Sequence, residues 1–285
     1  MRDDIHIILD SVACSEETQL KDDPRVHVVR LIMRHGEKEW LDGTMPVQEM
    51  FDLVEKTGVL AKTSQPSLGY MVEVFSELAK QGKKAIYITL SSVLSGTYQT
   101  ACMAAQQVMK EIAGSDIRVV DSKICASPVS GMAIDLLKLI DEGKSLDEIE
   151  LAAQDMVNRT VTLFSVNTLE YLHKGGRIGA VGAFLGSIFG IRPIVMIRED
   201  GVLKPVDKCR TRKKVLNRML ELISEEAPIE RIYVCHANTP EDAEYLAQAM
   251  ESRFPGVDIL KTSIGSVLAA HLGPGVIGLF VRRKP

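Results

Sequence analysis

The sequence predicts an α/β protein in which an N-terminal domain with a parallel sheet packs against a C-terminal α+β domain. Strand and helix signals alternate through the first half of the chain, which favours a parallel sheet covered on both faces. The second half contains a clear antiparallel hairpin signal. A chain of 285 residues has ample core for two domains, and we expect them at residues 1–160 and 161–285.

Three apolar segments of the first half end in polar residues and are typical of buried parallel strands: IHIILDS at 5–11, KAIYITLSS at 84–92 and DIRVVDS at 116–122. Apolar spacing predicts helices after TSQPS, from about residue 98 to 112, and around residues 129–140. In KSLDEIE, Ser145 followed by Glu148 has the pattern of a capping box, so another helix begins there.

The second half has a different order of elements. The segment TVTLFSV (160–166) predicts a strand, and TLEYLHKGG (168–176) predicts a short helix that two glycines end. PIVMIREDGVLKPVDK (193–208) predicts two strands joined at Asp200-Gly201, a favoured hairpin turn. Further segments predict a helix from about residue 212, the strand RIYVCHA, a helix through about residue 253, and the strands VDILKTSI and VIGLFV.

Residues 181–191 are apolar nearly all round and predict a glycine-spaced helix. Such a segment is usually plain core, but it also suits the wall of an apolar ligand cavity. The side chains that we expect to shape such a cavity are Phe184, Leu185, Ile188 and Phe189.

The stretch LAKTSQPS (60–67) indicates a helix start. Thr63 or Ser64 would cap the helix, Pro66 would lie in its first turn, and an apolar face would follow at Met71, Val74, Phe75 and Leu78. Whether these hydroxyls also hold a ligand is left open by this stretch alone.

Composition argues against several functional classes. The net charge of −4 indicates no basic face for nucleic acid or anionic lipid. The opening MRDDIHIILD has charges where a signal peptide needs an apolar run, and no apolar run is long enough to span a membrane. Five widely spaced cysteines are typical of reduced thiols, and six histidines show no metal-ligand spacing. We expect a cytoplasmic protein without a metal or cofactor.

The segment YITLSSVLSGTYQTA runs from a strand through a serine-rich loop into a helix. Ligands of parallel α/β sheets bind beyond the carboxyl ends of the strands, and a helix start favours an anion. The loop offers hydroxyl donors and, at Gly96, close approach of backbone to ligand; the donors are Ser91, Ser92, Ser95 and Thr97. The alternative is a serine N-cap with spare hydroxyls. The motifs of a phosphate loop, a dinucleotide fold and a nucleophile elbow are absent.

Three further residues have a functional and a plain interpretation. His271 lies just before a Gly-Pro-Gly turn, where it could donate to an acidic ligand or be satisfied by backbone. Arg177 follows two glycines and suits a carboxylate or phosphate, or a helix C-cap. Arg210 begins a basic cluster that is more often solvated helix surface. The strand ends Asp10-Ser11 and Asp121-Ser122 form a suggestive but weak pair.

These motifs together resemble one known family. LDS, KTSQPS, LSSVLSGTYQTA, DSK, LEYLHKGGRIG, IRPI, DGVLKPVDKCRTRKK, HA and HLGPGVIG occur in the order found in DegV family proteins. These are bacterial fatty-acid-binding proteins, some of which serve as the acyl-carrying subunit of fatty acid kinase. The resemblance extends across nearly the whole chain. One departure is Arg30, which replaces a usual proline but touches no ligand position.

The resemblance implies a two-domain protein that holds a long-chain fatty acid in a tunnel. The positions that it assigns to the ligand carboxylate, with the serine-rich loop included, are Thr63, Ser64, Ser92, Ser95, the backbone of Gly96, and His271. Arg177 and Arg210 fall where the family has arginines linked to acyl transfer or to docking on the catalytic kinase subunit. No nucleotide motif lies in this chain, so the resemblance implies a non-enzymatic carrier whose partner performs the ATP chemistry.

Two other functions remain open at this point. One is a serine-dependent acyl hydrolase with Ser95 as nucleophile and His271 as base, although no orienting carboxylate can be identified. The other is a lipid sensor with no kinase partner.

Overall fold

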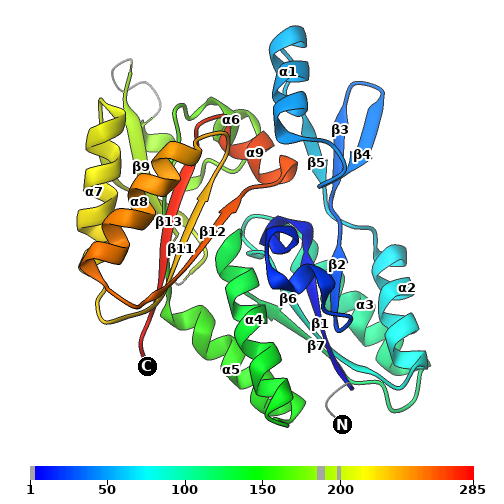
Figure 1. Ribbon diagram of the computed structural model, residues 1–285. Helices are drawn as coiled ribbons and strands as arrows, with labels where there is room; N and C mark the ends of the chain where they lie inside the picture. The colour runs from blue at the N-terminus through cyan, green and yellow to red at the C-terminus, as the bar shows by residue number, and fades with distance from the viewer. Residues whose placement is uncertain (1–3, 185–189, 198–199) are drawn as a thin grey trace.

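The computed structural model describes residues 4–184, 190–197 and 200–285, and Figure 1 shows the two predicted halves side by side. Each half is built around its own sheet, and helix α4 (Ser127–Asp141) lies between them. The predicted mixed α/β class, a parallel sheet beside a second sheet of mixed direction, is confirmed. The division at residue 160 stays a prediction; the chain passes there directly from helix to strand.

The first sheet is entirely parallel, with the strand order β2-β1-β6-β7. Its strands are β1 (Ile5–Asp10), β2 (Val26–Val29), β6 (Lys84–Thr89) and β7 (Ile117–Asp121). Helices α2 (Leu68–Lys80) and α3 (Thr97–Glu111) cover one face, and α4 and α5 (Leu146–Arg159) cover the other. Because both faces are covered, β1 and β6 are mostly apolar and buried, as the sequence indicates. Three short 3₁₀ turns follow β1: Ser11–Ala13, Ser15–Glu17 and Gln19–Asp22.

The helix starts follow local sequence closely. The capping box at α5 is present, with Ser145 and Glu148 bonded reciprocally, as predicted. At α2 the predicted cap was wrong, because Ser67 accepts the hydrogen bond from the Tyr70 N–H at 3.2 Å. Thr63 and Ser64 instead lie in a short strand, β5 (Lys62–Ser64).

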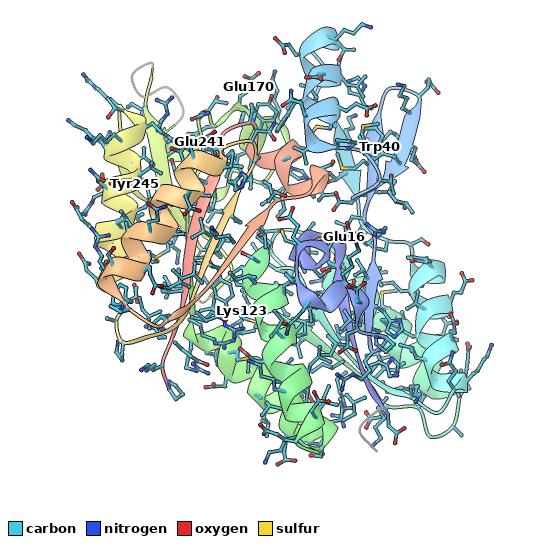
Figure 2. The ribbon with its side chains drawn as sticks, viewed as in Figure 1. Glu16, Trp40, Lys123, Glu170, Glu241 and Tyr245 are labelled. Carbon is cyan, nitrogen blue, oxygen red and sulfur yellow. The ribbon has the colours of Figure 1, made fainter. Side chains whose placement is uncertain are left out.

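This strand belongs to a small antiparallel sheet that the sequence analysis missed. The sheet has the order β4-β3-β5, with β3 (Ile32–His35) and β4 (Lys38–Leu41), and helix α1 (Val47–Thr57) packs beside it. Together these elements project above the first sheet, with Trp40 on the side of α1 (Figure 2). The strands of this small sheet are short and half exposed, which explains why the sequence shows no clear alternation of apolar and polar residues there.

The second sheet has six strands in the order β10-β9-β8-β13-β11-β12. They are β8 (Thr160–Ser165), β9 (Arg192–Ile197), β10 (Leu203–Cys209), β11 (Ile229–His236), β12 (Asp258–Ser263) and β13 (Ile277–Arg283). The β9–β10 hairpin is antiparallel, as predicted. Helices α7 (Arg212–Ser224) and α8 (Pro240–Arg253) cover the outer face, joined by a hydrogen bond from Tyr245 to Asn217 (Figure 2).

The inner face of the second sheet turns toward the first domain, and two short helices border it: α6 (Glu170–Lys174) and α9 (Ser266–Leu272). The first part of the helix expected over 181–191 belongs to a 3₁₀ helix, Gly179–Phe184, and residues 185–189 lie outside the described part of the chain. A 3₁₀ turn suits a run in which glycine recurs so often that α-helical propensity is low. The side chains of Phe184, Leu185, Ile188 and Phe189 lie outside the described part of the chain.

A buried ionic layer joins the two halves of the chain. Asp135 of α4 pairs with Arg282 of β13 and, at 3.1 Å, with Arg231 of β11. Arg282 is 1% exposed and also pairs with Glu230 at 3.0 Å. Since charges this deep are stable only when paired, Asp135 is the counter-ion that allows the sheet to pack against α4.

We predict that Asp135→Ala lowers the free energy of unfolding by about 3 kcal/mol, because it leaves two buried guanidinium groups without a shared partner. The control is Asp141→Ala at the end of the same helix, whose carboxylate is 54% exposed and pairs with Arg25. That substitution should cost less than about 1 kcal/mol. Urea unfolding of both variants checks the difference, and equal losses would contradict the role given to Asp135.

Candidate ligand-binding site

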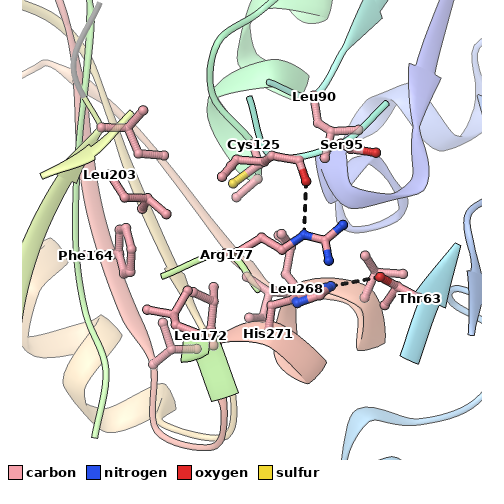
Figure 3. Close-up of a pocket in the computed structure, with 18 of the residues that line it drawn as sticks. Thr63, Leu90, Ser95, Cys125, Phe164, Leu172, Arg177, Leu203, Leu268 and His271 are labelled. Atoms are coloured by element: carbon pink, nitrogen blue, oxygen red, sulfur yellow. Dashed lines mark hydrogen bonds between the residues drawn. The ribbon is translucent and has the colours of Figure 1, made fainter. Parts of the chain in front are cut away.

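An apolar cavity of about 340 Å³ lies between the inner face of the second sheet and the loops of the first domain. Its walls are mostly apolar, and a few polar groups gather at one end (Figure 3). The apolar lining comprises Leu31, Leu90, Leu94, Cys125, Ala126, Phe164, Leu172, Ile197, Leu203, Cys235, Ile264, Val267, Leu268, Leu272, Val276, Gly278 and Phe280. The size and character are those of a pocket for a small apolar ligand with one polar end.

The serine-rich loop after β6 is held by two carboxylates, one on each neighbouring strand. Asp10 of β1 accepts hydrogen bonds from the Leu90 N–H at 2.5 Å and from the Tyr87 hydroxyl. Asp121 of β7 accepts from the Ser92 N–H at 3.0 Å and from the Ser92 hydroxyl at 2.5 Å. The loop is therefore fixed from both sides at the carboxyl end of the sheet.

Asp10 is 1% exposed and lies under the loop. Burial raises the pKa of Asp10 to about 7, against the hydrogen bonds from Tyr87 and Leu90, which lower it. Both donors stay bonded to the carboxyl group in the folded chain, so Asp10 supports the loop and leaves the cavity to other residues.

The polar end of the cavity is assembled from both domains. Thr63 of β5 is hydrogen-bonded through its hydroxyl to Nε2 of His271, on α9, at 2.8 Å (Figure 3). Arg177 donates from Nε to the Leu94 carbonyl at 3.2 Å, and from Nη1 to the Gly175 carbonyl at 2.7 Å. Burial, together with the positive charge of Arg177, lowers the pKa of His271 to about 4. The imidazole is therefore neutral at pH 7.

Ser95 and Gly96 complete this end at the start of α3. The Thr97 N–H donates to the Ser95 hydroxyl at 3.3 Å, and the hydroxyls of the two residues are 2.9 Å apart. The N-cap residue of α3 is Gly96, which has no side chain to accept from the next N–H groups, and the first turn has no acidic residue, so these N–H groups and the helix dipole favour an anion. A side chain at Gly96 would collide with Gln65, whose Oε1 lies 2.3 Å from the position of a Cβ atom.

The structure brings together five of the residues that the sequence predicts for a carboxylate: Thr63, Ser64, Ser95, Gly96 and His271 all line the cavity. Ser92 does not line it, because its hydroxyl is bonded to Asp121. Arg177, expected at a docking surface, borders the cavity itself. Arg210 is exposed and lies outside it. The roles of these residues stay predictions.

Sequence reasoning missed two residues that shape this site. Gln65 lines the cavity and donates to the Thr100 hydroxyl at 2.6 Å; its place in TSQPS was the available signal. Asp42, 1% exposed, accepts from the Val267 N–H at 3.1 Å in the first turn of α9, the helix that carries His271. Nothing in the sequence pairs Asp42 with a helix so far along the chain. Arg30 donates to the Asp42 carbonyl at 2.7 Å and lines no part of the cavity.

Comparison with known proteins identifies the family to which this chain belongs. Residues 4–284 match the family model described as "Uncharacterised protein, DegV family". The chain belongs to the DegV family. A DegV domain-containing protein of Halalkalibacterium halodurans is 36% identical over 280 residues, which cover 96% of this chain and 97% of that protein.

Solved DegV structures share the fold over almost the whole chain. A DegV family protein from Thermus thermophilus, described as fatty acid binding, has a TM-score of 0.87 and 28% identity, and the match covers 98% of this chain and 99% of that one. DegV from Bacillus subtilis, described as a fatty acid binding protein, has a TM-score of 0.86 and 29% identity over the same shares.

The geometry argues against hydrolase chemistry at this DegV site. His271 Nε2 is bonded to Thr63 rather than to Ser95, and within residues 4–184, 190–197 and 200–285 its Nδ1 has no hydrogen-bond partner. A general base needs a pKa near the working pH, and the pKa of the His271 imidazole lies well below neutral pH. In the same described ranges no cluster of His, Cys, Asp or Glu could hold a metal ion. No helix among them is long and apolar enough to cross a membrane.

We predict that His271 lowers the stability of the protein as the pH drops from about 6.5 toward 4, because the unfolded chain protonates His271 and the folded chain does not. The raised pKa of Asp10 acts in the opposite direction over this range, so the effect of His271 is measured as the difference between the unsubstituted protein and a variant. In His271→Gln this loss should be smaller by about 2 kcal/mol. Urea unfolding at neutral and mildly acidic pH measures it. The exposed His173, replaced in the same way, serves as control, and an unchanged pH dependence in His271→Gln would contradict a buried neutral imidazole.

Proposed function

We propose that this protein binds a long-chain fatty acid in the cavity, with the carboxylate at the Thr63–His271 end. The observation that carries the proposal is one apolar cavity whose only cluster of polar lining groups, within the described residues, lies where two domains meet. DegV structures of similar fold, described as fatty acid binding, support it. No cofactor is needed for such a function.

The polar end suits a carboxylate. A carboxylate taken from water needs several hydrogen bonds, or it takes up a proton instead. Here Ser95, Thr63, the first turn of α3 and the guanidinium of Arg177 offer donors around one point. The acyl tail supplies the affinity, at about 0.8 kcal/mol per buried methylene, so the tail decides binding and the polar groups decide orientation.

We further propose that the protein presents the bound carboxylate to the catalytic subunit of a fatty acid kinase, which forms the acyl phosphate. A second hollow of about 370 Å³ adjoins the polar end and shares with the cavity Leu94, Ser95, Gly96, Arg177 and Leu203. This hollow gives a partner a route to the carboxylate. The free thiols of all five cysteines support a cytoplasmic carrier.

The first test is native mass spectrometry of the purified protein, followed by organic extraction. The expected result is an additional mass that matches a long-chain fatty acid and leaves on denaturation. A protein that is empty and also fails to take up added oleate or palmitate would overturn the proposal.

Ser95→Ala should weaken fatty-acid binding by roughly tenfold or more, because a buried charged group loses one hydrogen bond. The matched control is Ser92→Ala in the same loop, whose hydroxyl is turned to Asp121. Displacement of a fluorescent fatty acid measures both affinities. An equal loss in the two variants would mean that the loop, rather than the Ser95 hydroxyl, matters to the ligand.

Arg210→Ala should leave fatty-acid affinity unchanged and slow acyl phosphate formation with a kinase subunit, because Arg210 is exposed away from the cavity. Arg177→Ala should lower both, since Arg177 borders the cavity. Lipid displacement and a coupled kinase assay separate the two effects. Loss of lipid affinity in Arg210→Ala would contradict the docking role. Failure of the unsubstituted protein to support any kinase would favour a lipid sensor.

A further inference from the structure

The floor of the cavity is a patch of the second sheet on which side chains lie in rows across the strands. One row runs from Cys235 of β11 through Gly278 of β13 to Phe164 of β8, because these residues are cross-strand partners. In the next row, Phe280 of β13 is the cross-strand partner of Thr162 of β8. All five residues line the cavity.

Strand β13 leads away from the polar end. It begins just after the turn that follows α9, and from Val276, immediately before the strand, every second residue lines the cavity: Val276, Gly278 and Phe280. A strand advances about 3.3 Å per residue, so Phe280 lies about 13 Å further along than Val276. Phe280 is therefore at the far end of the floor.

The ionic layer between the domains ends the floor beyond Phe280. The next residue of β13 on this face is Arg282, paired with Asp135. On β11 the corresponding residue is Arg231, which pairs with the same carboxylate at 3.1 Å. Neither arginine lines the cavity. An apolar chain gains nothing by reaching charged groups that are already paired, so this layer is a fixed end wall.

The ring of Phe280 folds back over Gly278. A Cβ atom at position 278 would lie 2.4 Å from Cζ of Phe280 and 2.8 Å from Sγ of Cys235. The ring therefore occupies the space that any side chain at position 278 would fill. Phe280 is 3% exposed and closely packed, and the empty space beside it is the cavity.

From this geometry we propose that Gly278 and Phe280 set the length of acyl chain that the cavity accepts. Glycine at position 278 lets the ring lie flat on the sheet, which leaves the far part of the cavity open. Any larger residue there turns the ring into that space and shortens the cavity. The inference rests on the proposed function, since it assigns the length limit of the same ligand.

Three variants test the pair. Gly278→Ala should weaken palmitate and stearate binding by about tenfold while laurate changes little, the effect expected when roughly two methylenes lose their place. Phe280→Leu should favour stearate over laurate, because leucine fills less space at the far end of the floor than the phenyl ring does. Gly278→Ala combined with Phe280→Leu should restore palmitate binding, since leucine does not reach over position 278.

Gly69→Ala on α2 is the matched control, because a Cβ atom there meets nothing within 4 Å. It should leave the chain-length profile unchanged. Affinities come from displacement of one fluorescent fatty acid by laurate, palmitate and stearate, with thermal melts to confirm folding. If Gly278→Ala does not fold, the relative affinities of Phe280→Leu for laurate, palmitate and stearate test the length-setting role by themselves.

Equal loss for all three acids in Gly278→Ala, or an unchanged profile in Phe280→Leu, would overturn the length-setting role while leaving fatty-acid binding intact. Failure of the unsubstituted protein to bind any of the acids would overturn the proposed function and this inference with it.

Discussion

The site depends on how two carboxylates, the buried Asp10 and the half-buried Asp121, hold one loop. Asp10 and Asp121 end the strands on either side of β6, and each accepts a backbone N–H from the loop that follows it. Because these two hydrogen bonds hold the loop, they also restrict the position of Ser95 and of the start of α3, which follow it in the chain. The Leu94 carbonyl, which receives Arg177 of the other domain, is fixed with them. The rest of the polar end is arranged around this loop.

The cavity lies between the two halves of the chain. The first half contributes the loop, β5 and the wall around Leu90 and Cys125, whereas the second contributes the sheet floor and α9 (Figure 3). Two polar contacts span the boundary near the proposed carboxylate position: Thr63 with His271, and Arg177 with Leu94. At the opposite end the domains are joined by the Asp135 ion pairs. The apolar space thus lies between two polar regions, one that offers donors to a ligand head group and one that is joined by ion pairs.

Burial decides the chemistry of the groups near the cavity. The imidazole of His271 is kept neutral, and burial raises the pKa of the Cys125 thiol to about 12, so neither is an acid–base or nucleophilic group at neutral pH. Such a site is suited to holding a molecule rather than transforming it. The proposed carrier function agrees with this electrostatic character.

Local sequence determined most strands of the two larger sheets and the helices that cover them, because apolar runs, caps and the Asp200-Gly201 turn act over a few residues. Strand β2, which is short and mostly half-buried, was not among the predicted strands. Local sequence also determined the family, through motifs of fixed order, and with them most residues of the polar end. It did not determine the small sheet or the 3₁₀ turn, where short half-exposed strands and frequent glycines leave no clear period. Only the tertiary structure decided that Ser92 turns to Asp121, that Asp42 holds α9, and that the ring of Phe280 lies over Gly278. Each of the first two is a contact between segments far apart in the chain, and the third depends on the strand partners that confine the ring, so no local pattern encodes them.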